Sequence, residues 1–497
     1  MVAPLKQLLV SISLHPLAAA LVLAALFWGL LLATPLRRLV VAFCERHGRR
    51  ALVAVSLTIV AVHLAVTVWY LLLPGFAGEV EPLISSVSWA VQSGQPLYHD
   101  FDAAEHYSIL YGPMTFLTNG LFLRLFGPSL VSAKLAAVLG CALALLFQYL
   151  ALTALVSRRM ALGFTALTVL LYQLGGAFSY KIRPDPLLIA AICFGLLSAV
   201  RGGRILAAAG VAAALGYAVN LKVHAFLYFL PVLVLLQRRR GWRAVLLAGA
   251  GGAVLVALPF LLNPRVSAQN YLIWLRESAR HGLDRHMFTM TLQLFLFLGL
   301  PPLALLLPGF RDARLLREQR PYLLALLGGG LGVLAFAAKP GAGLNHLLPL
   351  APLVLLPPAV LLTRLKAGAA DWRRVFSVPR LAVALAIGLA AAVAGPVTEY
   401  RCVRLTQSYS TQGKDVVQDL RRILAAYPDR SISMAYAGKY QNFQYAALRP
   451  YLVFAGQPVL LDVIAVMESD FAQRPLPART LEAVTSGRVA IWPAPRG

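Results

Sequence analysis

Long apolar runs recur along the whole chain, and they constrain the fold more than any other feature of the sequence. About 20 apolar residues let an α-helix cross a bilayer, and helices are the natural crossing element because backbone groups find no water in lipid. The runs lack the alternation of a membrane β-barrel. The sequence therefore predicts an all-α polytopic membrane protein with about twelve transmembrane helices, at about 17–34, 51–73, 131–156, 160–179, 186–200, 205–220, 221–237, 244–262, 287–308, 321–338, 347–363 and 379–398.

The distribution of charge gives these predicted helices an orientation. The net charge is +25, from 45 Lys and Arg residues against 20 Asp and Glu residues. The basic residues gather in short connections, as in loops on the cytoplasmic side of a membrane, and form no nucleic-acid-binding stripe. We therefore expect no nucleic-acid partner, and we expect both chain ends on the outer side. The basic connections are 37–50, 157–159, 201–204, 238–243, 311–320 and 363–374.

Three regions follow from this topology. Residues 1–50 add an N-terminal transmembrane helix and a basic cytoplasmic loop to a core at 51–398, which contains a long outer loop at 74–130. The tail, residues 399–497, predicts a small α/β domain outside the membrane, because an amphipathic helix pattern at 415–427 precedes short strand-like segments. The predicted strands are 431–438, 452–462 and 488–497.

Polar residues that cytoplasmic anchoring does not explain fall on the outer side. Five of the 20 acidic residues lie in one stretch, 79–105. In the same loop, we expect the apolar segment 111–127 to lie along the outer surface, because counting it as a span would place 157–159 outside. Charges near a membrane boundary are costly unless paired or functional, so we predict one polar cavity that opens outward. Its candidate members are Glu79, Glu81, Asp100, Asp102, Glu105, His106, Arg183, Asp185, Lys222, His224, Lys339, Asn345 and His346.

These residue types suit one kind of chemistry, and each also has a structural explanation. A carboxylate such as Glu81 can take the proton of an acceptor hydroxyl or hold a divalent cation. Cationic residues can neutralise a phosphate, and arginine can do so with two N–H groups. Together they suit transfer from a phosphate-linked donor. The structural explanations are solvation at a helix end for Glu79 and Glu81, capping for Asp100 and Asp102, interfacial anchoring for Arg183 and Lys222, and packing for His224 and His346.

Short motifs on the outer side form a recognisable set. Two glutamates, Glu79 and Glu81, follow an early span and open the long loop. The other motifs are Gly94–Asp100 (GQPLYHD), Tyr111-Gly112-Pro113, Leu125-Phe126-Gly127, Arg183-Pro184-Asp185, Asn220-Leu221-Lys222 and Asn345–Leu350. Over about residues 75–350 this set resembles the GT-C superfamily of membrane glycosyltransferases, which includes the protein O-mannosyltransferases and the aminoarabinose transferases of lipid A. That superfamily commonly has an Asp or an adjacent Asp–Glu pair where this chain has glutamates separated by a valine.

The resemblance implies a function and a role for each residue. It implies sugar transfer from a polyprenyl-phosphate-linked donor to a glycan, lipid or protein acceptor, with inversion, at the periplasmic face of a bacterial inner membrane. Glu81, favoured by its Glu-Pro step, or Glu79 would be the base, and Asp185 would position other groups. No cofactor is certain, and a divalent metal remains open. The resemblance assigns the donor phosphate to Arg183, Lys222 and Lys339, and an acceptor or metal site to Asp100, Asp102, His106, His224 and His346.

Three other functions are compatible with parts of this pattern. A transporter or flippase for a lipid-linked saccharide would place its charges near the middle of the bilayer and often contains internal repeats, and this sequence has no repeat. An acyl- or phospho-group transferase would need a nucleophile or a phosphate-handling group, for which His106, His224 and His346 are candidates. A membrane scaffold would not need the clustered acids. The positions of the charges relative to one cavity discriminate between these functions.

Overall fold

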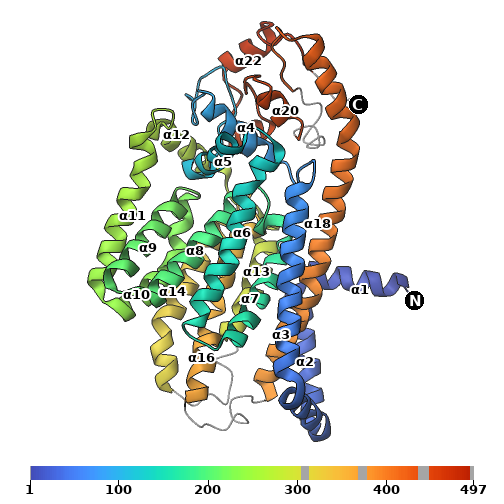
Figure 1. Cartoon of the computed structure of the whole chain (residues 1–497), viewed down its shortest axis with the longest axis vertical. Helices are drawn as coiled ribbons and strands as arrows, with labels where there is room; N and C mark the ends of the chain where they lie inside the picture. The colour runs from blue at the N-terminus through green and yellow to red at the C-terminus, as the bar shows by residue number, and fades with distance from the viewer. Residues whose placement is uncertain (1, 304–312, 368–377, 435–446, 493–497) are drawn as a thin grey trace.

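The computed structural model describes residues 2–303, 313–367, 378–434 and 447–492. These residues form a bundle of helices (Figure 1). The α-helices before the tail are α1 (Val2–Leu14), α2 (Pro16–Leu32), α3 (Thr34–Leu72), α4 (Val80–Gln92), α5 (Pro113–Phe126), α6 (Leu130–Thr153), α7 (Arg158–Gln173), α8 (Pro184–Arg201), α9 (Arg204–Val219), α10 (Phe226–Arg240), α11 (Trp242–Leu262), α12 (Ala268–Ser278), α13 (Arg285–Leu303), α14 (Ala313–Ala337), α15 (Ala351–Val354) and α16 (Leu356–Ala367). Then come α18 (Val378–Ala426), α20 (Arg449–Phe454), α21 (Val463–Phe471) and α22 (Ala478–Thr485). Short 3-10 turns are η1 (Gly176–Ser179), η2 (Val223–Ala225), η3 (Ala279–His281) and η5 (Leu344–Leu350).

The long apolar helices are candidate membrane spans by length and composition. Within the described ranges, eight helical segments are long and apolar enough to cross a bilayer, or nine if the bent pair α1 and α2 is one span. The other predicted spans coincide with helices of 15 to 17 residues, namely α2, α7, α9 and α10. The chain is thus a multi-pass membrane protein, and the count of twelve crossings stays a prediction.

Small residues allow the central helices to approach closely. A Cβ atom added at Gly216 of α9 would lie 2.5 Å from the Cβ of Leu255 on α11, and one added at Gly140 of α6 would lie 3.0 Å from the backbone of Pro186 on α8. Transmembrane helices associate through such small-residue contacts because lipid supplies little hydrophobic driving force between them. The α6–α8–α9–α11 row therefore gives the site a rigid base.

Two predicted boundaries are wrong. The basic connection 37–50 is not a loop but part of α3, which runs unbroken for 39 residues. Its five Arg residues favour helix, so the helix begins at Thr34, well before the candidate span at Arg46–Leu72. The tail likewise does not begin as a separate unit at 399, because α18 continues for 49 residues from its span to Ala426 and includes the predicted helix 415–427.

The predicted α/β fold of the tail is also not found. The described tail residues form helices and only isolated bridges, His106 to Leu461 and Ile432 to Ile491. The predicted strand 452–462 begins inside α20, where Pro450 occupies the first turn as proline prefers. A strand needs a long partner to satisfy its backbone, and these segments pair over single residues. Parts of the other two predicted strands, 435–438 and 493–497, lie outside the described residues.

The tail covers one end of the bundle, which we call the cap end. It carries α4, α5, α12, α20 and α22 (Figure 1). Helix α5 has 14 residues, too few to span a bilayer, and packs against α4 and α6. This agrees with the surface position predicted for 111–127.

Candidate functional site

A cavity of about 220 Å³ lies at the cap end. Its walls come from segments that are far apart in sequence: the start of the long loop, the turns before α8 and α10, the end of α14, η5, and helices α12 and α21. Two glutamates, three cations and three histidines contribute to the lining. They are Glu79, Arg183, Lys222, His224, His281, Lys339, His346 and Glu468.

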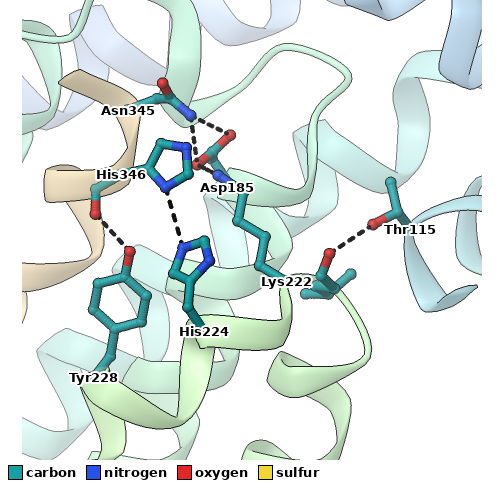
Figure 2. A network of polar contacts seen from close by, with 8 residues as sticks. Thr115, Asp185, Lys222, His224, Tyr228, Asn345 and His346 are labelled. Carbon is teal, nitrogen blue, oxygen red and sulfur yellow. Dashed lines mark hydrogen bonds and ion pairs between the residues drawn. The ribbon is translucent and has the colours of Figure 1, made fainter. Parts of the chain in front are cut away.

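The α8 start holds one charged pair at the base of the cavity. Asp185 lies in the first turn of α8, is fully buried, and accepts a hydrogen bond from Lys222 Nζ at 2.7 Å (Figure 2). Asn345 Nδ2 also donates to Asp185 Oδ1, at 3.4 Å. Lys222 lines the cavity while Asp185 lies behind it. Asp185 therefore fixes the position of Lys222 and compensates its charge.

The turn that carries Lys222 depends on a close backbone approach. Gly112 N donates to Leu221 O at 3.0 Å, and Thr115 Oγ1 donates to the same oxygen at 3.4 Å (Figure 2). A Cβ atom at Gly112 would lie only 2.2 Å from Asn220 O, which no side chain could tolerate. The Tyr-Gly-Pro motif thus positions Lys222 from the long loop.

Two histidines stack beside this turn. His346 Nδ1 lies 3.1 Å from His224 Nε2, and Tyr228 Oη donates to His346 O at 2.5 Å (Figure 2). The ring of His224 also stacks on Phe336. Across the described ranges, no group of three or more His, Cys, Asp or Glu side chains is arranged to hold a metal ion. The pair is therefore a packed wall of the cavity.

Arg183 and Lys339 complete the cationic lining. Arg183 precedes α8 with an extended backbone, and its guanidinium lies 4.8 Å from the centre of the Phe178 ring. Arg183 is 7% exposed, and its Nε has no hydrogen-bond partner among the described residues. Lys339 Nζ contacts Ser278 O at 3.4 Å. These cations can therefore receive an anion in the cavity.

The two glutamates of the long loop have different surroundings. Glu79 is partly exposed and lines the cavity. Glu81 is fully buried, outside the cavity lining, and accepts hydrogen bonds from Tyr70 Oη and, at 3.2 Å, from Ile182 N. Burial raises the pKa of Glu81, and nearby Lys181 opposes that shift. The sequence favoured Glu81, but the structure places Glu79 where a substrate could reach it.

The remaining acids and the histidine of this loop lie elsewhere. Asp100 and Asp102 are exposed, and Asp100 Oδ1 accepts from Asn270 Nδ2 at 2.8 Å. Glu105 forms an ion pair with Arg488 at 3.1 Å. His106 is buried against the tail. None of these residues lines the cavity, so the structure does not bring them together with His224 and His346 as one acceptor or metal site.

His106 is the centre of a contact that we call the tail latch, formed by His106, Leu460, Asp462 and Ser469. His106 N donates to Leu460 O at 2.7 Å, and Asp462 N donates to His106 O at 2.9 Å. His106 Nε2 lies 2.9 Å from Ser469 Oγ. Burial, reinforced by nearby His99, lowers the pKa of His106 to about 4. The latch therefore holds α21 over the cavity with a neutral histidine.

Sequence reasoning missed two groups. Glu468 of the tail and His281 of η3 line the cavity, and Glu468 was missed because the tail is predicted as a separate domain. The second group is a buried pair inside the bundle, in which His63 Nδ1 lies 3.0 Å from Glu399 Oε1 and Gln173 donates to Glu399 Oε2. The sequence did carry a signal for this pair, because His63 lies within the predicted span 51–73 and Glu399 directly follows the predicted span 379–398.

Comparisons with known proteins bear on the fold. No protein-family model matches the sequence, and no curated protein matches it. The crystal structure of ArnT from Cupriavidus metallidurans bound to undecaprenyl phosphate is similar with a TM-score of 0.53 at 16% identity, over 87% of this chain and 90% of that one. The oligosaccharyltransferase of Archaeoglobus fulgidus in its apo form has a TM-score of 0.44 at 12% identity, over 79% of this chain and 64% of that one, and this weaker similarity supports no conclusion. At such identity the ArnT likeness shows the fold alone, and this chain has an ArnT-like fold over 87% of its length, in agreement with the fold that the resemblance of its outer-loop motifs implies.

Proposed function

We propose that this protein is a membrane glycosyltransferase that moves a sugar from a polyprenyl-phosphate-linked donor to an acceptor at the periplasmic face of a bacterial inner membrane. The observation that carries the proposal is the cavity in which Arg183, Lys222 and Lys339 share a lining with Glu79. ArnT, which has the same fold, binds undecaprenyl phosphate. Three cations at the ends of membrane helices suit a ligand with a phosphate head and an apolar chain.

The proposed reaction is a single displacement. The oxygen of the acceptor hydroxyl forms a bond to the anomeric carbon of the sugar while the bond from that carbon to the phosphate oxygen breaks. The phosphate keeps the electron pair of the broken bond, and Arg183, Lys222 and Lys339 stabilise its charge. Glu79 accepts the proton of the hydroxyl as general base. Attack opposite the leaving phosphate inverts the anomeric configuration.

Two buried carboxylates have positioning roles in this proposal. Asp185 holds Lys222 through the 2.7 Å contact. Glu81 holds the turn before α8, because it accepts a hydrogen bond from Ile182 N. Ile182 lies two residues before Pro184, the first residue of α8. The proposal therefore assigns the base to Glu79 and leaves the choice of sugar and acceptor open.

The transporter alternative gains no support from the charged residues of the spans. A transport path requires polar groups that line water across the bilayer. His63 and Glu399 form one polar pair inside the bundle, and their side chains are 0% and 5% exposed. They are sealed by packing and line no path.

The test is transfer of radiolabelled sugar from a panel of undecaprenyl-phosphate sugars, in membranes that express wild type, Glu79→Gln or Glu81→Gln. We expect Glu79→Gln to lower the rate per folded protein at least about a hundredfold, as loss of a general base does. Glu81→Gln should lower the amount of folded protein instead. Full activity of Glu79→Gln would remove Glu79 from the base role. A wild type that neither transfers sugar nor binds undecaprenyl phosphate would overturn the glycosyltransferase proposal.

A further inference from the structure

The tail forms one wall of the cavity, and the reaction described above makes no use of it. Helix α21 faces the cavity through Ile464, Met467, Glu468 and Phe471. These positions are spaced i, i+3, i+4 and i+7, which places them on one face of a helix. Glu468 is the charged residue of that face. The tail thus presents a single carboxyl group to a cavity that is also lined by Arg183, Lys222 and Lys339.

Buried contacts fix the position of α21. Asp462 Oδ1 accepts a hydrogen bond from Ile464 N at 2.6 Å and so caps the helix. Arg449 forms an ion pair with Asp462, and both side chains are buried. The tail latch adds the contact of His106 with Ser469, the neighbour of Glu468. The carboxyl group of Glu468 is therefore presented by a supported helix and not by a free chain.

The carboxyl group of Glu468 is available to a ligand. In the described part of the chain, no side chain or backbone group forms a hydrogen bond or an ion pair with it. Burial, reinforced by the Asp462 carboxyl, raises the pKa of Glu468 to about 8. At neutral pH the group is therefore largely protonated, and it can both donate and accept a hydrogen bond.

We infer that Glu468 hydrogen-bonds a hydroxyl group of the sugar carried by the lipid donor, and so helps to select that sugar. This inference rests on the proposed function. With the donor phosphate at Arg183 and Lys222, the sugar attached to it extends into the remaining cavity, whose lining includes the α21 face. Phe471 on that face offers an apolar surface beside the carboxyl group. A site built to hydrogen-bond a substrate hydroxyl rejects a ligand that lacks it, because the polar group is then left unpaired.

The experiment compares binding of two kinds of lipid by the purified full-length protein in nanodiscs. The probes are undecaprenyl phosphate and undecaprenyl phosphate that carries glucose, mannose, galactose or arabinose. The proteins are wild type, Glu468→Ala, Glu468→Gln and the control Glu482→Gln, which removes an exposed carboxylate from α22 of the same tail. Thermal unfolding of each variant establishes that it is folded.

We expect wild type to bind at least one sugar-bearing lipid about tenfold more tightly than undecaprenyl phosphate, the effect of about one hydrogen bond. Glu468→Ala should abolish this preference and leave the affinity for undecaprenyl phosphate unchanged, while Glu468→Gln and Glu482→Gln should retain it. A preference that survives in Glu468→Ala, or a wild type that shows no preference for any of the four sugars, would overturn the inference. Absence of undecaprenyl phosphate binding by wild type would instead overturn the proposed function.

Discussion

Two of the sets of charged residues in the described part of the chain differ in how their charges are balanced. Inside the bundle, His63, Glu399 and Gln173 bond to one another and are almost fully enclosed. At the cavity, Glu79 and Arg183 form no ion pair with any described residue, although both line the same space. Balanced charges in an enclosed place stabilise one arrangement of helices. Charges that line a cavity without an ion-pair partner are available to a charged ligand. We therefore expect the enclosed set to contribute to stability and the cavity set to contribute to ligand binding.

The largest effect is expected from a substitution in the enclosed set of His63, Glu399 and Gln173. His63→Leu should lower the free energy of unfolding by about 3 to 5 kcal/mol, because Glu399 is then a buried charge without its histidine. Thermal or denaturant unfolding in detergent micelles measures the loss. The double variant His63→Leu/Glu399→Gln should recover most of it, since no charge remains. If His63→Leu unfolds like wild type but loses sugar transfer, the enclosed pair belongs to the function and the comparison fails.

The next effect concerns the open set. Arg183→Ala should weaken binding of undecaprenyl phosphate about tenfold to a hundredfold, because a hydrogen bond to a charged group contributes about 1.5 to 3 kcal/mol. Its free energy of unfolding should stay close to that of wild type, since Arg183 has no ion-pair partner among the described residues to leave behind. Arg201→Ala is the control, because that arginine lies at the far end of α8. Equal losses of binding in both variants would remove Arg183 from the phosphate site.

The smallest expected effect is a pH dependence of the tail latch, which should change the protection of α21 but not that of α8. The pKa of His106 is about 4 in the folded chain and about 6.5 when the latch is open. At His106 the open state therefore binds more protons below pH 6.5, so this residue should weaken the latch by about 2 kcal/mol at pH 5. Asp462 and Glu468, with pKa values raised to about 7 and about 8, act in the opposite direction, and the difference between wild type and His106→Gln isolates the contribution of His106. Hydrogen exchange of α21, corrected for intrinsic pH dependence, should show this while α8 stays protected. His106→Gln, which does not titrate, should remove the effect, and an unchanged pH dependence in that variant would show that another group is responsible.

The sequence was sufficient for the parts of the fold that the membrane dictates. Apolar length and basic connections predict a helix at every expected span, because lipid leaves few other choices for the backbone. The cavity was also predicted in outline, since Glu79, Arg183, Lys222, Lys339 and His346 line one space. Charges at one face of a membrane protein are few enough to be grouped by topology alone.

The remainder depends on tertiary contacts. The local Glu-Pro step favours Glu81 over Glu79 as the base, and only the position of Tyr70 and Ile182 shows that Glu81 is enclosed. The strand prediction at 452–462 failed because β-prone residues outside the membrane still need a partner strand, and Leu461 finds only His106. Glu468 was missed because the path of the tail over the cavity is set by the tail latch, a contact between segments that are far apart in the sequence.

Helix α18 has a consequence for how proteins of this shape can vary. Its 49 residues extend about 74 Å at 1.5 Å per residue, more than twice the thickness of a hydrocarbon core. The length of the helix therefore sets how far from its span the tail begins, and the direction from which the tail returns to the cavity. Each residue inserted in its outer half would raise the tail by about 1.5 Å and turn it by about 100°. Substitutions in the tail should thus be tolerated more readily than changes in the length of this helix.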